Sequence, residues 1–287
     1  MNKKVFKKIL LAILLLFIAF IVLYPVIWII GSSFNKSQSL LSAGISPIPK
    51  ELSLLQYERL FKTTKYANWY FNTFKIASIN MILSVLLTVS TAYIFSRFKF
   101  KGKKTSLISI LILQMFPSFL GMVAIYILLS RITFLSTFTG TKSLINTHLG
   151  LILVYACGQI PYNTWLVKGY FDTIPRSLDD AAKIDGASNI KAFWKIILPL
   201  GRPIISFVAI TNFMAPWMDF IFPRLIITSP EKRTLAVGLY EMIKGHSDNA
   251  FTMFAAGAVL VAVPITILFS CFQKYIVTGL SSGAVKG

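Results

Sequence analysis

Residues able to perform acid–base or nucleophilic chemistry are few in this sequence of 287 residues, which holds ten Asp and Glu, two His and two Cys. Asp219 is the one acid within a long apolar stretch, and no second acid or histidine shares that stretch. A lone carboxylate supports little general acid–base catalysis. We therefore expect no catalytic site. Asp219 instead becomes a candidate for lining a polar translocation pathway with Asn212 and Trp217, and pairing with Arg224 is the alternative.

The cysteines and histidines do not form a metal-binding pattern. Cys157 and Cys271 each lie in an apolar run, and His148 and His246 each stand alone in a polar stretch. A metal site needs several ligands that converge. The sequence thus predicts no metal site, and the cysteines are interpreted as small buried hydrophobic residues.

A fragment at residues 102–105, GKKT, resembles the end of a phosphate-binding loop. Such a loop requires a second glycine five residues before the Gly-Lys pair, and Arg97 occupies that place. No cofactor is therefore expected on this chain, and ATP with Mg would have to bind a separate subunit.

The polar segment at residues 172–200 carries the clearest pattern. Ser177 followed by Asp180 predicts the start of a helix through a capping box, and Gly186 predicts its end in the left-handed conformation. One face of this helix would carry Leu178, Ala181, Ala182 and Asp185. Two adjacent alanines make that face shallow, which suits the close approach of a partner protein.

A second helix is predicted directly after the glycine turn. Ser188 would cap its start and Pro199 would end it. Its apolar residues recur at helical spacing and form one stripe: Ile190, Phe193, Trp194 and Ile197. The two helices would either dock to a partner protein or lie on the lipid surface.

The elements around this segment are long and apolar. Hydrophobic residues make up 55% of the chain and charged residues only 14%, against about 25% in soluble domains. Six stretches approach the ~20 apolar residues needed to cross a bilayer. They are residues 9–30, 74–95, 107–129, 149–170, 203–227 and 251–277. The sequence predicts an all-α, polytopic membrane protein with six transmembrane helices.

The net charge of +19 is explained by topology and not by nucleic-acid binding. If the six stretches cross the membrane, 17 Lys and Arg fall on the side of the termini and 10 on the opposite side. Cytoplasmic loops carry the excess of basic residues. Both termini are therefore expected in the cytoplasm, with the segment at residues 172–200 on the same side.

That segment resembles the signature of permease subunits of binding-protein-dependent ABC importers. The signature is Glu-Ala-Ala, then Gly after three residues, then Ile-x-Leu-Pro after nine more. The matching residues are Asp180, Ala181, Ala182, Gly186, Ile196, Leu198 and Pro199, with Asp180 in place of Glu. Residues 234–238, 254–258, 264–266 and 279–287 also resemble the smaller permease of maltose/maltodextrin importers.

The resemblance implies a type I ABC importer permease fold in a bacterial plasma membrane. It implies a second homologous permease, two cytoplasmic ATPase subunits and an extracellular sugar-binding protein as partners, with lipid around the helices. The expected organisation is an N-terminal helix with its external connector (1–70), a transmembrane core (71–277) and a cytoplasmic tail (278–287). The residues expected to couple to the ATPases are Asp180, Ala181, Ala182, Asp185, Gly186, Phe193 and Pro199. The region expected to contact the binding protein includes Lys232, Arg233 and Tyr240.

The expected function is the transport of an oligosaccharide, foremost maltodextrin or maltose, and not an enzymatic reaction. Galacto-oligosaccharides, raffinose-type sugars and glycerol phosphates are alternatives within the same class. A solitary channel is the alternative outside it, but the sequence lacks the rings of charged residues that ion selectivity requires.

Overall fold

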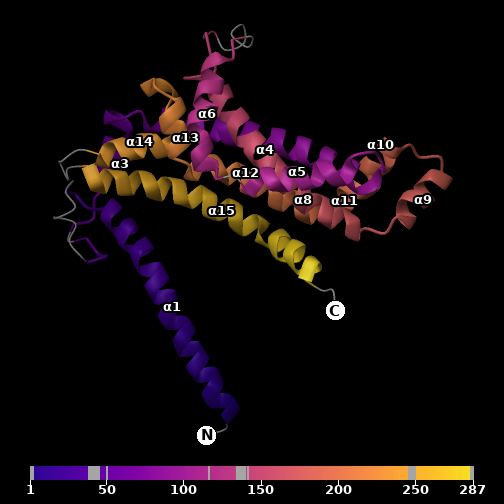
Figure 1. The fold of residues 1–287 in the computed structure, drawn as a ribbon. Helices are drawn as coiled ribbons and strands as arrows, with labels where there is room; N and C mark the ends of the chain where they lie inside the picture. The colour runs from indigo at the N-terminus through magenta and orange to yellow at the C-terminus, as the bar shows by residue number, and fades with distance from the viewer. Residues whose placement is uncertain are drawn as a thin grey trace. The chain divides into compact units, whose positions relative to one another are not determined.

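The computed structural model describes residues 3–37, 46–49, 51–115, 117–133, 140, 142–244 and 250–284. These residues form helices and connecting loops (Figure 1), and their one β-type pairing is an isolated bridge between Asn35 and Leu52. The chain divides into two compact units. The first comprises Met1–Asn68 and Val237–Pro264, and the second comprises Trp69–Ala236 and Ile265–Gly287.

The first unit contains α1 (Lys3–Ser33), α3 (Leu55–Thr63) and the initial part of α15 (Phe251–Ala284). Helix α14 (Leu235–Ile243) also lies mainly in this unit. Tyr66 is buried and donates a hydrogen bond from its hydroxyl to the Gly257 carbonyl at 2.9 Å. The rings of Trp28 and Phe251 lie 5.5 Å apart, which joins the end of α1 to the start of α15.

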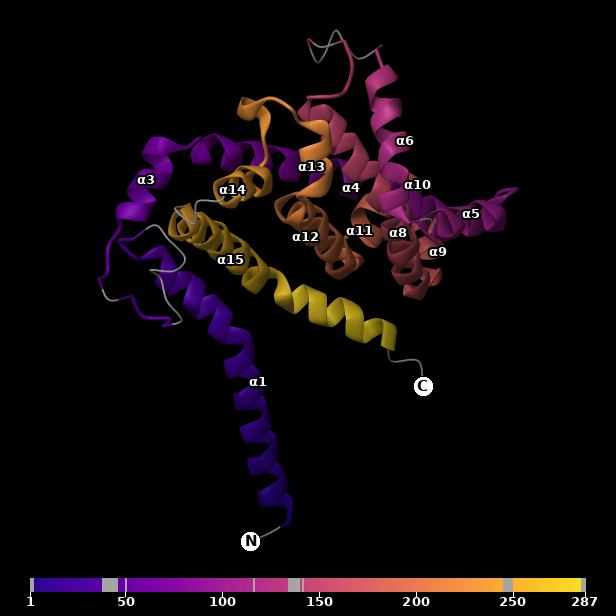
Figure 2. The same cartoon turned by 60° about the vertical axis from the view of Figure 1, so that its left-hand side comes forward.

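The second unit is built around α4 (Tyr66–Arg97), α8 (His148–Thr173) and α12 (Arg202–Met218). Its other elements are α5 (Lys103–Met115), α6 (Ser118–Arg131), α9 (Ser177–Ile184), α10 (Asn189–Ala192), the π-helical turn η1 (Phe193–Ile197), α11 (Leu198–Leu200), α13 (Ile221–Ile226) and the 3-10 turn η2 (Pro230–Lys232). Within this unit α9 and α13 lie far apart in both views (Figures 1 and 2).

Two hydrophobic clusters hold the second unit together. One joins α4, α8, η1 and α12 through buried residues that include Val89, Phe171, Ile197 and Val208. The other joins α4, α6, α8 and α13 through residues that include Ile76, Leu151 and Ile226. The first cluster lies directly behind the segment at residues 172–200, so this segment rests on a packed core.

The described helices give a range for the number of membrane spans. The described residues contain three helices long and apolar enough to cross a membrane, or up to five spans if two bent helix pairs each count as one. The expected stretches 9–30, 74–95, 149–170 and 251–277 each lie within one continuous helix. The count of six remains a prediction.

Two expected spans are not single helices. The stretch 107–129 divides into α5 and α6, which meet at 107° on either side of Pro117, and the two helices diverge clearly in Figure 2. The stretch 203–227 ends its helix at Met218, because Asp219 is extended and starts the separate helix α13. Apolar composition predicts burial in lipid but does not reveal where the backbone turns.

The long helices expose their apolar side chains. The side chains of α1 are exposed along most of its length, and Leu16 is 71% exposed. Such extensive apolar exposure is stable in lipid and not in water. The chain is therefore a membrane protein.

Candidate functional site

The helix α9 and the turn after it follow from local sequence. Gly186 has φ +74°, which lies in the left-handed region that glycine adopts without strain, and α9 ends just before it. Ser188 then caps α10 by accepting a hydrogen bond from the Lys191 amide. Both features confirm the sequence prediction. The predicted capping box does not form, because Arg176 takes the capping position and makes no side-chain bond to the helix.

The second helix does not end at Pro199, contrary to the prediction. The π-helical turn η1 precedes the proline, so the helical path widens there and continues through α11 to Leu200. The break comes at Gly201, where the chain bends by 78° into α12. The predicted apolar stripe also splits: Ile197 is fully buried and Phe193 partly buried, while Ile190 and Trp194 are 72% and 56% exposed.

The two alanines of α9 point in different directions. Ala182 is buried, while Ala181, Asp180 and Asp185 are exposed. The expected shared face of these residues is therefore wrong for Ala182. The outer side of α9 also carries apolar groups, with Leu178 38% exposed and Ile184 88% exposed.

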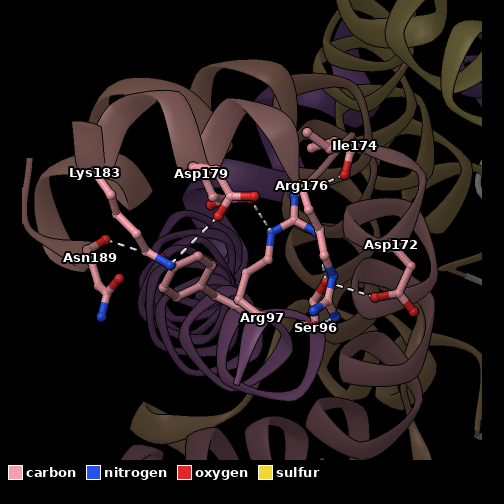
Figure 3. Close-up of polar contacts among 10 residues, drawn as sticks. Ser96, Arg97, Asp172, Ile174, Arg176, Asp179, Lys183 and Asn189 are labelled. Carbon is pink, nitrogen blue, oxygen red and sulfur yellow. Dashed lines mark hydrogen bonds and ion pairs between the residues drawn. The ribbon is translucent and has the colours of Figure 1, made fainter. Parts of the chain in front are cut away.

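A buried ion pair holds α9 to the end of α4 (Figure 3). Arg97 Nε lies 2.9 Å from Asp179 Oδ2, and the two side chains are 7% and 12% exposed. Neither atom has a hydrogen-bond partner among the described residues, so their contact is electrostatic. Arg97 also donates through Nη2 to the Ile174 carbonyl at 3.0 Å. One guanidinium thus contacts both α9 and the loop that leads into it.

A second polar group holds the start of the connector. Ser96 donates to Asp172 Oδ1 at 2.7 Å, and Lys168 Nζ lies 2.6 Å from Asp172 Oδ2. Arg176 Nη2 donates to the Ser96 carbonyl at 3.1 Å. Figure 3 shows Ser96, Asp172 and Arg176 gathered where α4, α8 and α9 meet. The end of α4 therefore touches the connector on both sides of Ile174.

The turn and α10 are held by Tyr93. Its hydroxyl donates to the Asn189 carbonyl at 3.0 Å, and its ring centroid lies 4.7 Å from that of Phe193. A groove of about 410 Å³ opens between α4, α9 and α10, with Arg97, Asp179, Asp180 and Lys183 along it. Lys183 Nζ is 3.9 Å from Asp180 Oδ1, and both side chains are largely exposed.

The arrangement gives adjacent aspartates different surroundings. Asp179 is buried against Arg97, and Asp180 faces outward. Asp180 was predicted from the sequence as a coupling residue, whereas Arg97 was not. The available signal was an arginine at the end of an apolar stretch in a protein whose few acids gather at residues 172–185.

The three expected pathway residues have different surroundings in the structure. Asn212 is buried and lines a pocket between α8 and α12. Trp217 packs its ring against Tyr70 at a centroid distance of 5.0 Å. Asp219 Oδ2 accepts from the Tyr155 hydroxyl at 2.8 Å, while Oδ1 accepts from the Ile221 amide at the start of α13. Asp219 therefore stabilises the turn between α12 and α13.

The residues expected to contact a binding protein differ in their availability. Lys232 Nζ donates to the Asn146 carbonyl at 2.9 Å, so it holds a loop of its own chain. Arg233 is partly buried, and its carbonyl accepts from Asn72. Tyr240, in the first unit, is 40% exposed. The expected tail ends at residues 285–287, which lie outside the described residues, as does His246.

The fold and the site together define the class of protein. Apolar helices exposed to lipid surround a packed core, and a short helix with an exposed outer side is held rigidly to the end of a long helix. This combination is that of a membrane protein with several apolar helices and a structured connector between two of them. The chain belongs to the family of binding-protein-dependent transport system inner membrane components, whose model matches residues 81–282.

Known relatives are transport permeases of similar length. The galactooligosaccharides transport system permease protein GanQ of Bacillus subtilis is 42% identical over 278 residues, which cover 96% of this chain and 94% of the relative. The maltodextrin transport system permease protein MdxG of the same organism is 38% identical and covers 99% and 98%. The maltose/maltodextrin permease MalG of Escherichia coli is 41% identical over 219 residues, covering 76% and 72%.

Solved structures show the same fold. A chain from the crystal structure of a bacterial ABC transporter involved in the import of the acidic polysaccharide alginate matches with a TM-score of 0.81 at 22% identity, covering 96% of this chain and 98% of that chain. A chain from the complex of a bacterial alginate ABC transporter with its pentasaccharide-bound periplasmic protein gives 0.69 at 15% identity, covering 93% of each. The predicted ABC importer permease fold is confirmed, and members of this family are transport components and not enzymes.

Proposed function

We propose that this chain is one of two permease subunits in an ATP-driven importer of oligosaccharides. In this assembly an extracellular binding protein delivers the sugar, and two ATPase subunits on the cytoplasmic side bind ATP and Mg. The named relatives support the cargo class, since they are permeases for galactooligosaccharides and for maltodextrin. The match to a binding-protein-dependent family supports the delivery route.

The proposal rests mainly on the fixed position of α9 against α4. Its inner side is tied to α4 by the ion pair of Arg97 and Asp179, while Ile184 projects outward and Leu178 is partly exposed. A helix held in this way moves together with the span to which it is attached. We infer that the ATPase contacts the outer side, formed by Leu178, Asp180, Ala181, Ile184 and Asp185, and that Gly186 sets the angle to α10. Closure of the ATPases would then shift the spans between inward and outward access.

Phe193 and Pro199 were also expected to couple this chain to the ATPases. Both lie in the helical path that leads from the glycine turn to α12. Phe193 packs against Tyr93 and against the first hydrophobic cluster. Pro199 lies inside the continuous helical path before the bend at Gly201. We assign to both the transmission of movement from α9 into α12, and not direct contact with the ATPase.

The orientation in this proposal places both termini in the cytoplasm of a bacterium. The distribution of Lys and Arg supports it, with 17 on the side of the termini and 10 opposite. Six spans and a 278–287 tail on the ATPase side agree with this orientation. The binding protein would approach the opposite side, where Arg233 and Tyr240 are candidates for contact, while Lys232 Nζ is bonded within the chain.

Uptake by the reconstituted importer tests the function. The complex with this chain, its partner permease, the ATPases and the binding protein is placed in proteoliposomes, and uptake of labelled maltotriose and of a galactotriose is measured with and without ATP. We expect ATP-dependent uptake of at least one of the two. If neither sugar nor a raffinose-type sugar is taken up, and a glycerol phosphate is, the proposed cargo class is wrong.

Galactooligosaccharide is the second candidate cargo. The specific observation in its favour is the higher identity to GanQ, 42%, than to MdxG, 38%. The ratio of the two uptake rates in the same experiment decides between the candidates.

A further inference from the structure

A pocket of about 330 Å³ lies among α5, α8 and α12, apart from the connector described above. Its lining is dominated by side chains that form hydrogen bonds without carrying charge: Gln114, Gln159, Tyr162, Asn163, Thr211 and Asn212. Its volume is at the lower end of the range of small-ligand sites, about 300–1,000 Å³. The pocket lies entirely within the second unit.

Two independent helices place this pocket at mid-membrane depth. Asn212 follows the first residue of α12, Arg202, by ten residues, which correspond to about 15 Å of helix. Asn163 precedes the last residue of α8, Thr173, by ten residues, which is the same distance. Arg202 and Thr173 both border the connector, so both distances start from one side of the membrane. Half of a ~30 Å hydrocarbon core is about 15 Å.

Contact with lipid is energetically unfavourable for an amide side chain at this depth. An uncharged polar group without a hydrogen-bond partner in an apolar medium costs several kcal/mol, about 4–8 in the least polar solvents. Gln159 Oε1 is buried and has no hydrogen-bond partner among the described residues. The unpartnered Gln159 oxygen calls for water or a polar ligand in the pocket.

The amides are held in fixed positions by the helices around them. Asn80 of α4 donates to the Asn212 carbonyl at 2.8 Å, and Asn80 Oδ1 in turn accepts from Ser84 at 3.2 Å. Asn212 Nδ2 donates to the Val208 carbonyl at 2.6 Å, and Asn163 Nδ2 donates to Asn212 Oδ1 at 3.4 Å. Such bonds fix the orientation of the side chains before a ligand arrives, which reduces the entropy lost on binding.

We propose that this pocket is a sugar-binding subsite on this chain, which holds hydroxyl groups of a neutral oligosaccharide during its passage. This inference rests on the proposed function. Amide groups both donate and accept hydrogen bonds, and sugar hydroxyls require both. Tyr162 adds an aromatic surface for the apolar face of a sugar ring. None of the described residues that line the pocket carries a formal charge, so an acidic sugar or a phosphate ester finds no cation here.

Protection of a cysteine from a thiol reagent tests the subsite directly. Thr211 lines the pocket and is exposed, so Thr211→Cys is reachable from it. Cys157 and Cys271 are also exposed, contrary to their interpretation from the sequence as buried residues, and both are replaced by serine first. The variant importer is assembled with its binding protein and a non-hydrolysable ATP analogue, and the rate of modification is measured with and without the transported sugar. At a sugar concentration ten times Kd we expect modification about tenfold slower, because about nine sites in ten are occupied. Equal rates in the presence and absence of sugar overturn the proposal.

Transport by amide variants tests it a second way. Gln159→Leu and Asn163→Leu each remove a hydrogen-bonding group from the pocket, while Gln273→Leu is the matched control, an exposed amide that does not line it. We expect the two pocket variants to lower uptake about tenfold, as the loss of one well-placed hydrogen bond predicts, with sugar-stimulated ATP hydrolysis within twofold of the control. Uptake equal to that of Gln273→Leu overturns the subsite and leaves the proposed function intact. Absence of uptake by the unaltered importer contradicts the proposed function itself.

Discussion

Arg97 Nε and Asp179 Oδ2 lie 2.9 Å apart, 82 positions apart in the sequence, with both side chains nearly buried. The pair joins the last residue of α4 to the first turn of α9. Its neighbour Asp180 is exposed and lies on the outer side of the same helix. In our account the first aspartate holds the helix to the membrane core and the second meets the ATPase.

Substitution by asparagine should therefore change stability differently at Asp179 and at Asp180. Asp179→Asn leaves the Arg97 charge buried without its partner, and removal of one member of a buried pair costs about 3–5 kcal/mol. Asp180→Asn, at a side chain 71% exposed, should change stability by less than ~0.5 kcal/mol. Thermal unfolding of the purified complex measures both. Equal shifts for the two variants would show that the buried pair does not hold α9.

A double substitution separates charge from packing. Arg97→Met with Asp179→Leu removes both charges and keeps apolar volume, so it should recover most of the stability lost in Asp179→Asn. The same unfolding measurement applies. If the double variant is less stable than the single one, the hydrogen bond from Arg97 to Ile174 is the more important contact.

Substitutions at Gly186 should act through the backbone conformation of this position and not through the volume of the new side chain. A Cβ at this position meets nothing within 4 Å, but φ is +74°. A β-branched residue is strongly strained there, by about 1–2 kcal/mol or more, whereas asparagine adopts this conformation more readily. We expect Gly186→Val to lower the number of sugar molecules transported per ATP hydrolysed while the protein remains in the membrane, and Gly186→Asn to lower it less. Normal transport by Gly186→Val would refute the role of the turn.

Replacement of Gly257 and of Gly169 by alanine should change the stability of the protein in opposite directions. A Cβ on Gly257 lies 2.5 Å from Leu239 Cδ2 and 3.1 Å from Tyr66 Cε2, so Gly257→Ala should overpack the first unit and destabilise it by about 1–3 kcal/mol. A Cβ on Gly169 meets nothing within 4 Å, and Gly169→Ala should stabilise α8 by about 0.5–1 kcal/mol. Unfolding temperatures of the two variants measure this. Destabilisation by Gly169→Ala of the same size would contradict the packing account.

Features set by neighbouring residues were predictable from the sequence. Gly186 and Ser188 determine the turn and the cap through their own backbone and side chain, and both appear as predicted. The long helices α1, α4, α8 and α15 also follow from apolar length alone.

Features set by contacts between distant segments were not predictable. Nothing local distinguishes Asp179 from Asp180, and only the approach of Arg97 decides which one is buried. The inward turn of Ala182 and the outward turn of Ile184 depend in the same way on where α9 rests. The partners of Asp219 were also not predictable, because Tyr155 lies 64 positions away in the sequence.

The most direct test of the central claim, that the outer side of α9 contacts the ATPase, is co-purification of the ATPase subunits with a tagged form of this chain. Ile184→Asp changes an 88% exposed side chain, so it should leave the unfolding temperature unchanged but reduce the co-purified ATPase. Ile190→Asp, at a side chain 72% exposed on α10, is the matched control and should retain it. Undiminished recovery of ATPase with Ile184→Asp, or purification of the unaltered chain without any ATPase, would contradict the account.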